Sequence, residues 1–280
     1  MNHDPRPVKI SVIITTYNRP DALEMVLFSF VGQKNAPAFE VIIADDGSTE
    51  DTTWLIQQWQ DRVLPFNLFH SWQADEGFRA AASRNRAAAR ARGEYLLFVD
   101  GDCVVFPDFV ARHWALARGG WFVAGSRLLL DSAPTQACLT GKLPSPVEWS
   151  WSMWGAIWRK KGVNRLLPLL RLPDGFWRKL HPRRWKGVRT CNLGVWRGDF
   201  LAINGFDETF TGWGFEDADL AVRLMAVGIG HKSGRFAVPV VHLWHEERPR
   251  ADEPRNWQRL QQTLRGEMSP YAVNGVAQYF

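Results

Sequence analysis

The first 130 residues alternate short runs of β-branched and aromatic residues with longer stretches in which apolar residues recur at helical spacing. Neighbouring parallel strands need a crossover connection of a dozen or more residues, usually a helix, so this alternation predicts an α/β fold: a mostly parallel sheet flanked by helices. The predicted strands are Ile10–Thr16, Phe39–Ala44, Leu68–Trp72 and Glu94–Val99. The predicted helices are Asp21–Gln33, a helix that begins after an N-cap at Ser48 or Thr49, and Ala80–Arg92 with Gly93 as its C-cap.

A chain of 280 residues, 46% of them hydrophobic and 22% charged, has the composition of one or two compact domains. No apolar run approaches the ~20 residues of a membrane-spanning helix, and the first ten residues lack the apolar core of a secretory signal. The three cysteines, Cys103, Cys138 and Cys191, show no C-x-x-C spacing. This argues against a disulfide framework or a thiolate zinc site and favours a reducing compartment. We therefore expect a soluble cytoplasmic protein.

Residues 131–190 interrupt the alternation, because prolines and tryptophans replace the β-branched residues there. From position 141 to 190 the chain carries twelve Lys and Arg residues against two acids, whereas the whole chain has a net charge of +5. We expect this segment to be a basic insertion, which a negatively charged partner would meet. Regular structure should resume after it, with strands at Cys191–Trp196 and Phe236–Leu243 and helices at Phe215–Val227 and Asn256–Leu264.

Acidic residues follow three of the predicted strands, at the edge of an open parallel sheet where ligands bind. They are Asp45, Asp46, Asp75, Asp100 and Asp102. A single Asp-Gly-Ser is usually only a turn, but three acid-bearing strand ends in succession indicate a site. The last two acids flank one glycine after a buried run, so both carboxylates could reach one divalent cation such as Mg²⁺ or Mn²⁺.

Basic and amide side chains lie close to the same edge. Arg79, Arg84 and Asn85 are near the start of the third predicted helix, where guanidinium groups and backbone N–H groups suit a diphosphate. Arg90 and Arg92, further along this helix, are expected to be solvated.

These segments resemble a known enzyme family. The stretches SVIITTYNRP, VIIADDGST and QADEGFRAAASRNRAAARARGEYLLFVDGDC resemble the nucleotide-sugar half of family-2 glycosyltransferases, which have the GT-A fold. The later stretch CNLGVWRGDFLAINGFDETFTGWGFEDADLAVRL resembles the acceptor-side motif of β-1,4-galactosyltransferases and chondroitin-polymerase-type transferases. The resemblance covers about two-thirds of the chain. It implies that residues 1–130 bind a nucleotide sugar and that residues 191–280 complete the same domain with the acceptor and catalytic part.

The resemblance also implies donor-side roles for matching positions. Thr15, Tyr17 and Arg19 would line the base and ribose pocket, and Asp45 or Asp46 would bond the base or ribose. From their positions at a strand end and near a helix start, rather than from the resemblance, we expect Asp75, Arg79, Arg84 and Asn85 to complete the donor site. Asp100 would touch the ribose or the metal, and Asp102 would bind Mn²⁺ or Mg²⁺. In such transferases a later histidine completes the metal site; the candidates are His242 and His245, and their spacing does not place both on one side of an extended chain.

The acceptor side centres on Glu216 and Asp217, which open a predicted helix after Gly-Trp-Gly. The helix dipole favours acids there without any catalytic role. The resemblance implies that Asp217 is the general base and Glu216 an acceptor-binding neighbour. Trp213 could stack on an acceptor sugar or pack as a plug, and both alternatives stay open. Asp219 and Arg223, four residues apart, are predicted to form an ion pair on the helix surface.

The insertion has its own pattern. Trp151, Trp154 and Trp158 would share one face of a helix over Val147–Lys161, with a cluster of bases at its end. Tryptophans and bases together are typical of helices that lie in a bilayer interface, so we hypothesise docking on the cytoplasmic membrane. One alternative is that the tryptophans pack onto the sheet. Another is that the segment binds nucleic acid, but the sequence shows no pattern of an RNA-binding or DNA-binding fold.

We therefore predict a metal-dependent, inverting glycosyltransferase that moves a hexose or N-acetylhexosamine from a nucleotide diphosphate sugar, first of all a UDP-sugar. The predicted acceptor is a cell-envelope glycan such as lipopolysaccharide core or a lipid-linked saccharide. Two alternative functions are a sugar-nucleotide pyrophosphorylase and a non-catalytic binding module. A sugar-nucleotide pyrophosphorylase would carry a G-x-G-x-R loop after the first strand, where this chain reads TTYNRPDAL. A non-catalytic nucleotide-sugar-binding module would not need the carboxylates and histidines named above.

Overall fold

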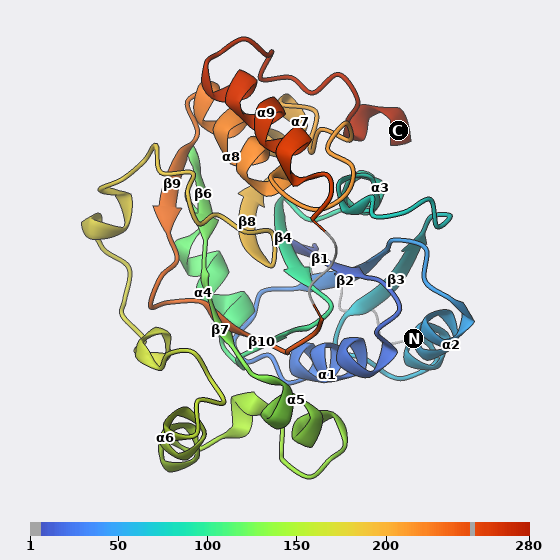
Figure 1. Ribbon diagram of the computed structural model, residues 1–280, viewed down its shortest axis with the longest axis vertical. Coiled ribbons are helices and arrows are strands. Elements are labelled where there is room, and N and C mark those ends of the chain that lie inside the picture. The colour runs from blue at the N-terminus through green and yellow to red at the C-terminus, as the bar shows by residue number, and fades with distance from the viewer. Residues whose placement is uncertain (1–6, 247–249) are drawn as a thin grey trace.

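The computed structural model describes residues 7–246 and 250–280. The first six residues, which belong to the segment predicted to lack a secretory signal, lie outside the described part. A seven-stranded sheet in the order β3-β2-β1-β4-β8-β6-β9 forms the centre of the molecule (Figure 1). Its strands are β1 (Ile10–Thr16), β2 (Phe39–Asp45), β3 (Asn67–Trp72), β4 (Tyr95–Asp100), β6 (Trp121–Ala124), β8 (Asn192–Trp196) and β9 (Gly230–Ser233). Residues from before and after the insertion thus share one sheet.

The first four strands are parallel, and β8 is antiparallel to both β4 and β6. Alternate residues of β1 enter different cores, because successive strand residues point to opposite faces. Val12 and Ile14 belong to the core on one face and Ile13 to the core on the other, and all three are fully buried. The predicted mostly parallel α/β sheet is confirmed.

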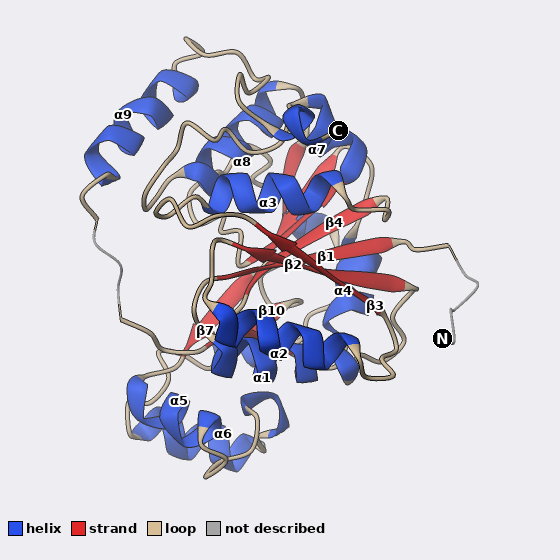
Figure 2. Cartoon of the chain, turned by 90° about the vertical axis from the view of Figure 1, so that its right-hand side faces the viewer, coloured by secondary structure: helices blue, strands red, loops and turns tan. Residues whose placement is uncertain are grey.

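Helices cover both faces of this sheet (Figure 2). One face is covered by α1 (Pro20–Val31), α2 (Glu50–Gln60) and α4 (Phe109–Leu116). The other face is covered by α3 (Ala80–Ala89), α7 (Arg197–Ala202) and α8 (Glu216–Ala226). The helix α9 (Glu253–Leu264) packs on α8, and the 3-10 turn η4 (Val276–Tyr279) packs on α3.

A smaller sheet in the order β5-β10-β7 lies beside the ends of the central strands. It consists of β5 (Cys103–Val105), β7 (Ser126–Leu129) and β10 (Pro239–His242). The strand β10 is shorter than the predicted Phe236–Leu243, because Phe236 has a left-handed φ of 59° and the N–H groups of Ala237 and Val238 bind Gly234 O in a turn. The pairing of β10 with β5 brings His242 opposite Cys103.

Gly93 does not cap α3, as the sequence suggested. The helix ends at Ala89 and Arg90 is its C-cap. Gly93 instead lies against β1: its N–H donates to Ser11 Oγ, and a Cβ at this position would lie 2.5 Å from Ser11 N. The glycine is required by this close approach of two backbones.

The insertion folds into helices and turns: α5 (Ser132–Leu139), η1 (Pro146–Glu148), α6 (Trp151–Arg159), η2 (Leu167–Leu169) and η3 (Phe176–Lys179). Ser150 caps α6 by accepting from Met153 N. The three tryptophans of α6 do not share one environment. Trp154 is buried against Trp149, whereas Trp151 and Trp158 are 65% and 50% exposed. Only a narrow stripe of α6 therefore faces the core. Packing against the body of the protein applies to Trp154, whereas Trp151 and Trp158 remain available to solvent or to a partner.

Within the part of the chain that the structure describes, none of the helices combines the length and the apolar character needed to span a bilayer.

Candidate active site

The guanidinium group of Arg84 joins three segments that are far apart in the sequence. Its Nε donates to Thr15 Oγ1 (3.0 Å) at the end of β1, and its Nη2 contacts Asp100 Oδ1 (3.2 Å) at the end of β4. Its Nη1 contacts Glu216 Oε1 (3.1 Å) in the first turn of α8. Burial opposes the charge of Arg84, but Asp100 and Glu216 outweigh this effect and raise its pKa. The predicted donor and acceptor halves therefore meet at one buried cation.

Asp217 lies next to this contact and is buried. Its Oδ1 accepts from Ala218 N (2.7 Å), and its Oδ2 lies 3.6 Å from Arg189 Nη1. Burial, followed by the charge of Glu216, raises the pKa of Asp217 to about 7, although the positive charges of Arg189 and Arg84 act in the opposite direction. A carboxylate with a pKa near neutrality is suited to take up a proton at physiological pH.

The loop before α8 explains how these acids are presented. Gly212, Gly214 and Phe215 have left-handed φ values of 70°, 105° and 73°, and a Cβ on Gly212 would lie 2.1 Å from Asp252 Oδ2. This tight turn places Trp213 just before the helix. Trp213 is half-buried, and the Arg250 guanidinium lies 4.5 Å from its ring centroid. One ring face is thus covered by a cation.

The candidate metal ligands converge where β10 ends. Asp102 Oδ1 lies 3.5 Å from His242 Nε2, and Asp102 Oδ2 lies 3.4 Å from His245 Nε2. One ligand atom from each of the three residues lies within 4.8 Å of the others. Leu243 N binds Asp102 O and Trp244 N binds Thr135 Oγ1, so the chain after β10 is held beside Asp102 and both histidines reach its carboxylate. Sequence spacing alone left open whether both histidines reach Asp102, because residues three apart in an extended strand point to opposite sides.

A carboxylate and two imidazoles form a mixed oxygen and nitrogen donor set. Mg²⁺ prefers oxygen ligands and keeps several waters, whereas first-row transition ions accept imidazole more readily. Asp102, His242 and His245 therefore fit Mn²⁺ better than Mg²⁺. Asp100 does not join them, since its carboxylate binds Arg84.

Two of the remaining donor-side candidates contact each other. The Tyr17 hydroxyl donates to Asp75 Oδ2 (2.9 Å), and Asp75 Oδ1 accepts from Gly77 N. The loop after β3 is thereby tied to the end of β1. Arg19 Nε contacts Asp21 Oδ1 (3.1 Å) in the first turn of α1 instead.

Asp45 and Asp46 point inward and bind groups of the protein. Asp45 is fully buried between Ser48 N (2.8 Å) and His70 Nε2 (2.9 Å). Asp46, also buried, accepts from Gln73 Nε2 and from the backbone N–H of Arg79. In this structure both carboxylates hold strand-end loops together.

Arg79 and Asn85 lie away from the Arg84 contact. Arg79 binds Glu76 and Ala74 O within its own loop. Asn85 is fully buried; it donates to Phe206 O (2.8 Å) and Glu208 Oε1 (2.9 Å) and accepts from Phe206 N. Successive helical residues point about 100° apart, so Arg84 and its neighbour Asn85 face different surroundings.

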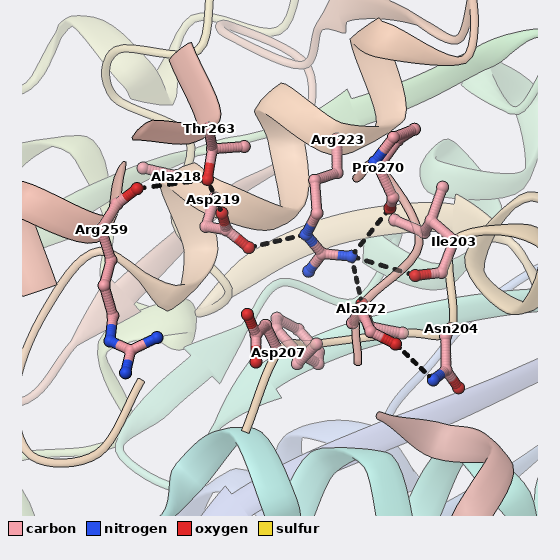
Figure 3. A network of polar contacts seen from close by, with 12 residues as sticks. Ile203, Asn204, Asp207, Ala218, Asp219, Arg223, Arg259, Thr263, Pro270 and Ala272 are labelled. Atoms are coloured by element: carbon pink, nitrogen blue, oxygen red, sulfur yellow. Dashed lines mark hydrogen bonds and ion pairs between the residues drawn. The ribbon is translucent and has the colours of Figure 1, made fainter. Parts of the chain in front are cut away.

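The predicted ion pair of Asp219 and Arg223 in α8 is confirmed (Figure 3). Its predicted position on the helix surface is wrong, because both partners are buried. Arg223 Nε donates to Asp219 Oδ2 (2.7 Å), and its Nη1 donates to Ile203 O and Gly205 O. Thr263 of α9 donates to the other oxygen of Asp219 (2.8 Å). The pair fixes α8, and with it Asp217, against α9 and the chain after α7.

Two residues near the acceptor side could not be recognised as functional from the sequence. Arg189, beside Asp217, ends the basic block and carried no motif signal of its own. Asn256, fully buried in α9, donates to the carbonyl oxygens of Thr211 (3.0 Å) and Trp213 (3.3 Å). It holds the loop that carries Trp213, and nothing in the local sequence indicates this role.

The chain is similar in sequence to known glycosyltransferases. A family model described as "Glycosyl transferase family 2" matches residues 11–140, and one described as "N-terminal domain of galactosyltransferase" matches residues 177–246. The chain is 32% identical over 230 residues to validoxylamine A glucosyltransferase of Streptomyces hygroscopicus subsp. limoneus, covering 79% of this chain and 48% of the relative. It is 27% identical over 259 residues to chondroitin synthase of Escherichia coli, covering 86% of this chain and 35% of the relative. The chain thus spans about half or less of the length of these relatives.

Solved structures share the fold. TarS 1–349 from S. aureus in complex with UDP-GlcNAc superimposes with a TM-score of 0.64 at 16% identity, covering 97% of this chain and 69% of that chain. The mannosyltransferase PcManGT from Pyrobaculum calidifontis in complex with GDP-Man and Mn²⁺ superimposes with a TM-score of 0.60 at 17% identity, covering 94% of this chain and 66% of that chain. At this identity the likeness concerns the GT-A fold alone.

Proposed function

The chain belongs to glycosyltransferase family 2, and from this premise we propose that it transfers a hexose or N-acetylhexosamine from a nucleotide diphosphate sugar to a glycan hydroxyl, with inversion at the anomeric carbon. The observation that carries the proposal is the Arg84 guanidinium, which binds Thr15 and Asp100 on the donor side and Glu216 on the acceptor side. A donor seated at the strand ends would then present its sugar next to Asp217.

UDP-sugars are the first donors to test. TarS has been crystallised with UDP-GlcNAc and PcManGT with GDP-Man. We propose that the donor lies over the ends of β1 and β4, bounded by Tyr17 and Asp75 at the base and by Asp100 at the ribose. Asp45, Asp46, Arg79 and Asn85 then support this site from below or from the side, because their polar groups already bind the protein.

Asp217 is the proposed general base. In a single displacement, the acceptor oxygen bonds to the anomeric carbon while the bond from that carbon to the donor phosphate oxygen breaks, which inverts the configuration. Asp217 takes the acceptor hydroxyl proton, and Arg189 limits how far its pKa rises. Glu216, anchored to Arg84, positions the helix end and offers a carboxylate to the acceptor. Trp213 contributes an aromatic surface beside them.

The donor set of Asp102, His242 and His245 fits a divalent ion, with Mn²⁺ favoured over Mg²⁺. When bound, such an ion would offset the charge of the departing diphosphate. This chain holds the three ligands on the β4–β5 turn, at the end of β10 and just after it, next to the smaller sheet of β5, β10 and β7.

The insertion supports an envelope acceptor and attachment to the cytoplasmic face of the inner membrane. Its exposed apolar side chains are Trp151, Trp158, Leu167, Leu170, Leu172, Phe176, Trp177 and Leu180. The bases Arg159, Lys160 and Lys161 follow α6 and are exposed. Exposed aromatic and basic side chains together suit an anionic bilayer surface, where each base contributes about 1 kcal/mol. Arg178 is buried and binds Ser233 O and Arg235 O, so it holds the insertion to the body instead.

Co-sedimentation with phosphatidylglycerol-containing vesicles tests this attachment. We expect binding at low salt that weakens as salt is raised and that falls when Trp151 and Trp158 are both changed to Ala. Trp54→Ala on α2 is the matched control, because Trp54 is 62% exposed but lies outside the insertion. No binding at low salt, or an equal loss with the control, would contradict membrane docking.

Thermal unfolding with a panel of nucleotide sugars, each with and without Mn²⁺, tests the transferase proposal. A ligand that binds only the folded state must raise the melting temperature, so a UDP-sugar or GDP-sugar should do so in the presence of the metal. If none of the nucleotide sugars raises the melting temperature, the proposed donor site is contradicted. Donor binding without slow donor hydrolysis or transfer would favour the non-catalytic module, and family membership speaks against a pyrophosphorylase.

A further inference from the structure

Two of the three cysteines meet in the fold although the sequence separates them widely. Cys191 directly precedes β8, where Asn192 pairs with Val99, so Cys191 lies beside the end of β4. Cys103 opens β5 just after the turn that follows β4. The two sulfur atoms lie within 4.8 Å of each other. The sequence lacks the spacing of a thiolate metal site, yet the tertiary structure brings these two cysteines together.

A carboxylate completes this cluster. One oxygen of Asp100 and the sulfur atoms of Cys103 and Cys191 all lie within 4.8 Å of one another. Both thiols are buried, whereas Asp100 is partly open to solvent. Apolar packing alone would account for two buried thiols, which behave as small hydrophobic groups. It does not by itself bring a carboxylate, which Arg84 also contacts, within reach of both sulfur atoms.

We propose that Asp100, Cys103 and Cys191 form a binding site for a thiophilic divalent cation, with Zn²⁺ as the expected ion. Two thiolates and one carboxylate provide three ligands of a tetrahedral zinc site and leave the fourth position to water. Each thiol gives up its proton to solvent as the metal–sulfur bond forms. Because Zn–S bonds are about 2.3 Å long, small side-chain rotations would draw the sulfur atoms together.

This site differs in chemistry from its neighbour. Cys103 Sγ lies 3.6 Å from Asp102 Oδ1, so the two groups of ligands are adjacent. The group of Asp102, His242 and His245 offers oxygen and nitrogen donors, whereas the new group offers sulfur, which selects softer ions. A thiophilic ion on Asp100 would compete with Arg84 for that carboxylate. Its binding should therefore inhibit transfer; this consequence rests on the proposed function, whereas the binding itself does not.

Cobalt substitution tests the binding on the full chain, reduced and freed of metal with a chelator. Co²⁺ held by thiolates gives a charge-transfer absorption band in the near ultraviolet, which imidazole and carboxylate ligands do not. We expect this band in the wild type, its loss in Cys191→Ser and in Cys103→Ala, and its displacement by Zn²⁺. Cys138→Ser is the matched control, because Cys138 is also buried but binds Pro144 O away from the cluster. His245→Ala should keep the band.

No band in the folded wild type would overturn the proposal, as would a band that persists in folded Cys191→Ser and Cys103→Ala or disappears in Cys138→Ser. Circular dichroism establishes which variants are folded. In a Mn²⁺-supported transfer assay, Zn²⁺ should inhibit the wild type at a concentration at least tenfold lower than Cys191→Ser. Equal sensitivity would overturn the inhibitory role. If the protein has no transferase activity, the proposed function fails but the cobalt result still tests the metal site. Failure of the proposed function and failure of the metal-site proposal are therefore distinguishable.

Discussion

Asp217→Asn separates the catalytic role of this carboxylate from its effect on stability. The amide keeps the shape of the side chain and can still accept from Ala218 N, but it cannot take up a proton. General-base catalysis is worth about 10²–10⁴-fold, so transfer should fall by at least about 100-fold. Binding of the nucleotide sugar should be retained, because among the described residues Asp217 accepts from Ala218 N and pairs with Arg189, neither of which is a donor-side residue.

The same change should stabilise the protein above neutral pH. Burial raises the pKa of Asp217 from 3.8 to about 7, so the fold favours the protonated form. The favourable contribution is complete below the unfolded value and is lost as the pH rises through the folded value. At about 1.4 kcal/mol per pKa unit, the carboxylate lowers the free energy of unfolding by at most about 4 kcal/mol above pH 7. The Asn variant avoids this loss.

Thermal unfolding between pH 4 and pH 8 checks the argument. The melting temperature of Asp217→Asn should match the wild type near pH 4 and exceed it by several degrees at pH 8, at roughly 2 °C for each kcal/mol in a chain of this size. Asp61→Asn, at the exposed end of α2, is the control and should show no such trend. A variant less stable than the wild type at pH 8, or one that retains turnover, would refute the assignment.

Three further predictions follow from single contacts. Arg189→Gln should move the pKa seen in the pH profile of kcat/KM upward, because the charge of Arg189 lowers the pKa of Asp217; the exposed Arg183→Gln serves as control, and an unchanged profile would mean that another group is the base. His245→Ala should weaken Mn²⁺ binding in calorimetry by about tenfold or more, whereas the exposed His181→Ala should not; equal affinities would remove His245 from the site. Gly93→Ala should cost about 1–3 kcal/mol in denaturant unfolding, since its Cβ would lie 2.5 Å from Ser11 N, whereas Gly198→Ala, with open space around it, should be tolerated.

Local sequence patterns determined the framework of this protein. The strand β1 has the predicted bounds, and α8 differs from the predicted helix by one residue at each end. Both depend on neighbours along the chain, because strand alternation and helical spacing are properties of contiguous residues. The same holds for the acids at the carboxyl ends of the strands, since parallel strands necessarily end at one edge.

The tertiary structure alone decided which of these residues meet. The Arg84 contact with Glu216, the approach of both histidines to Asp102 and the meeting of Cys103 with Cys191 depend on strand order, on register and on the course of the chain after β10. The burial of the Asp219–Arg223 pair depends on α9 packing over α8. A one-dimensional pattern records the periodicity of one element, whereas contacts between distant segments are selected by how whole elements pack and where their loops turn.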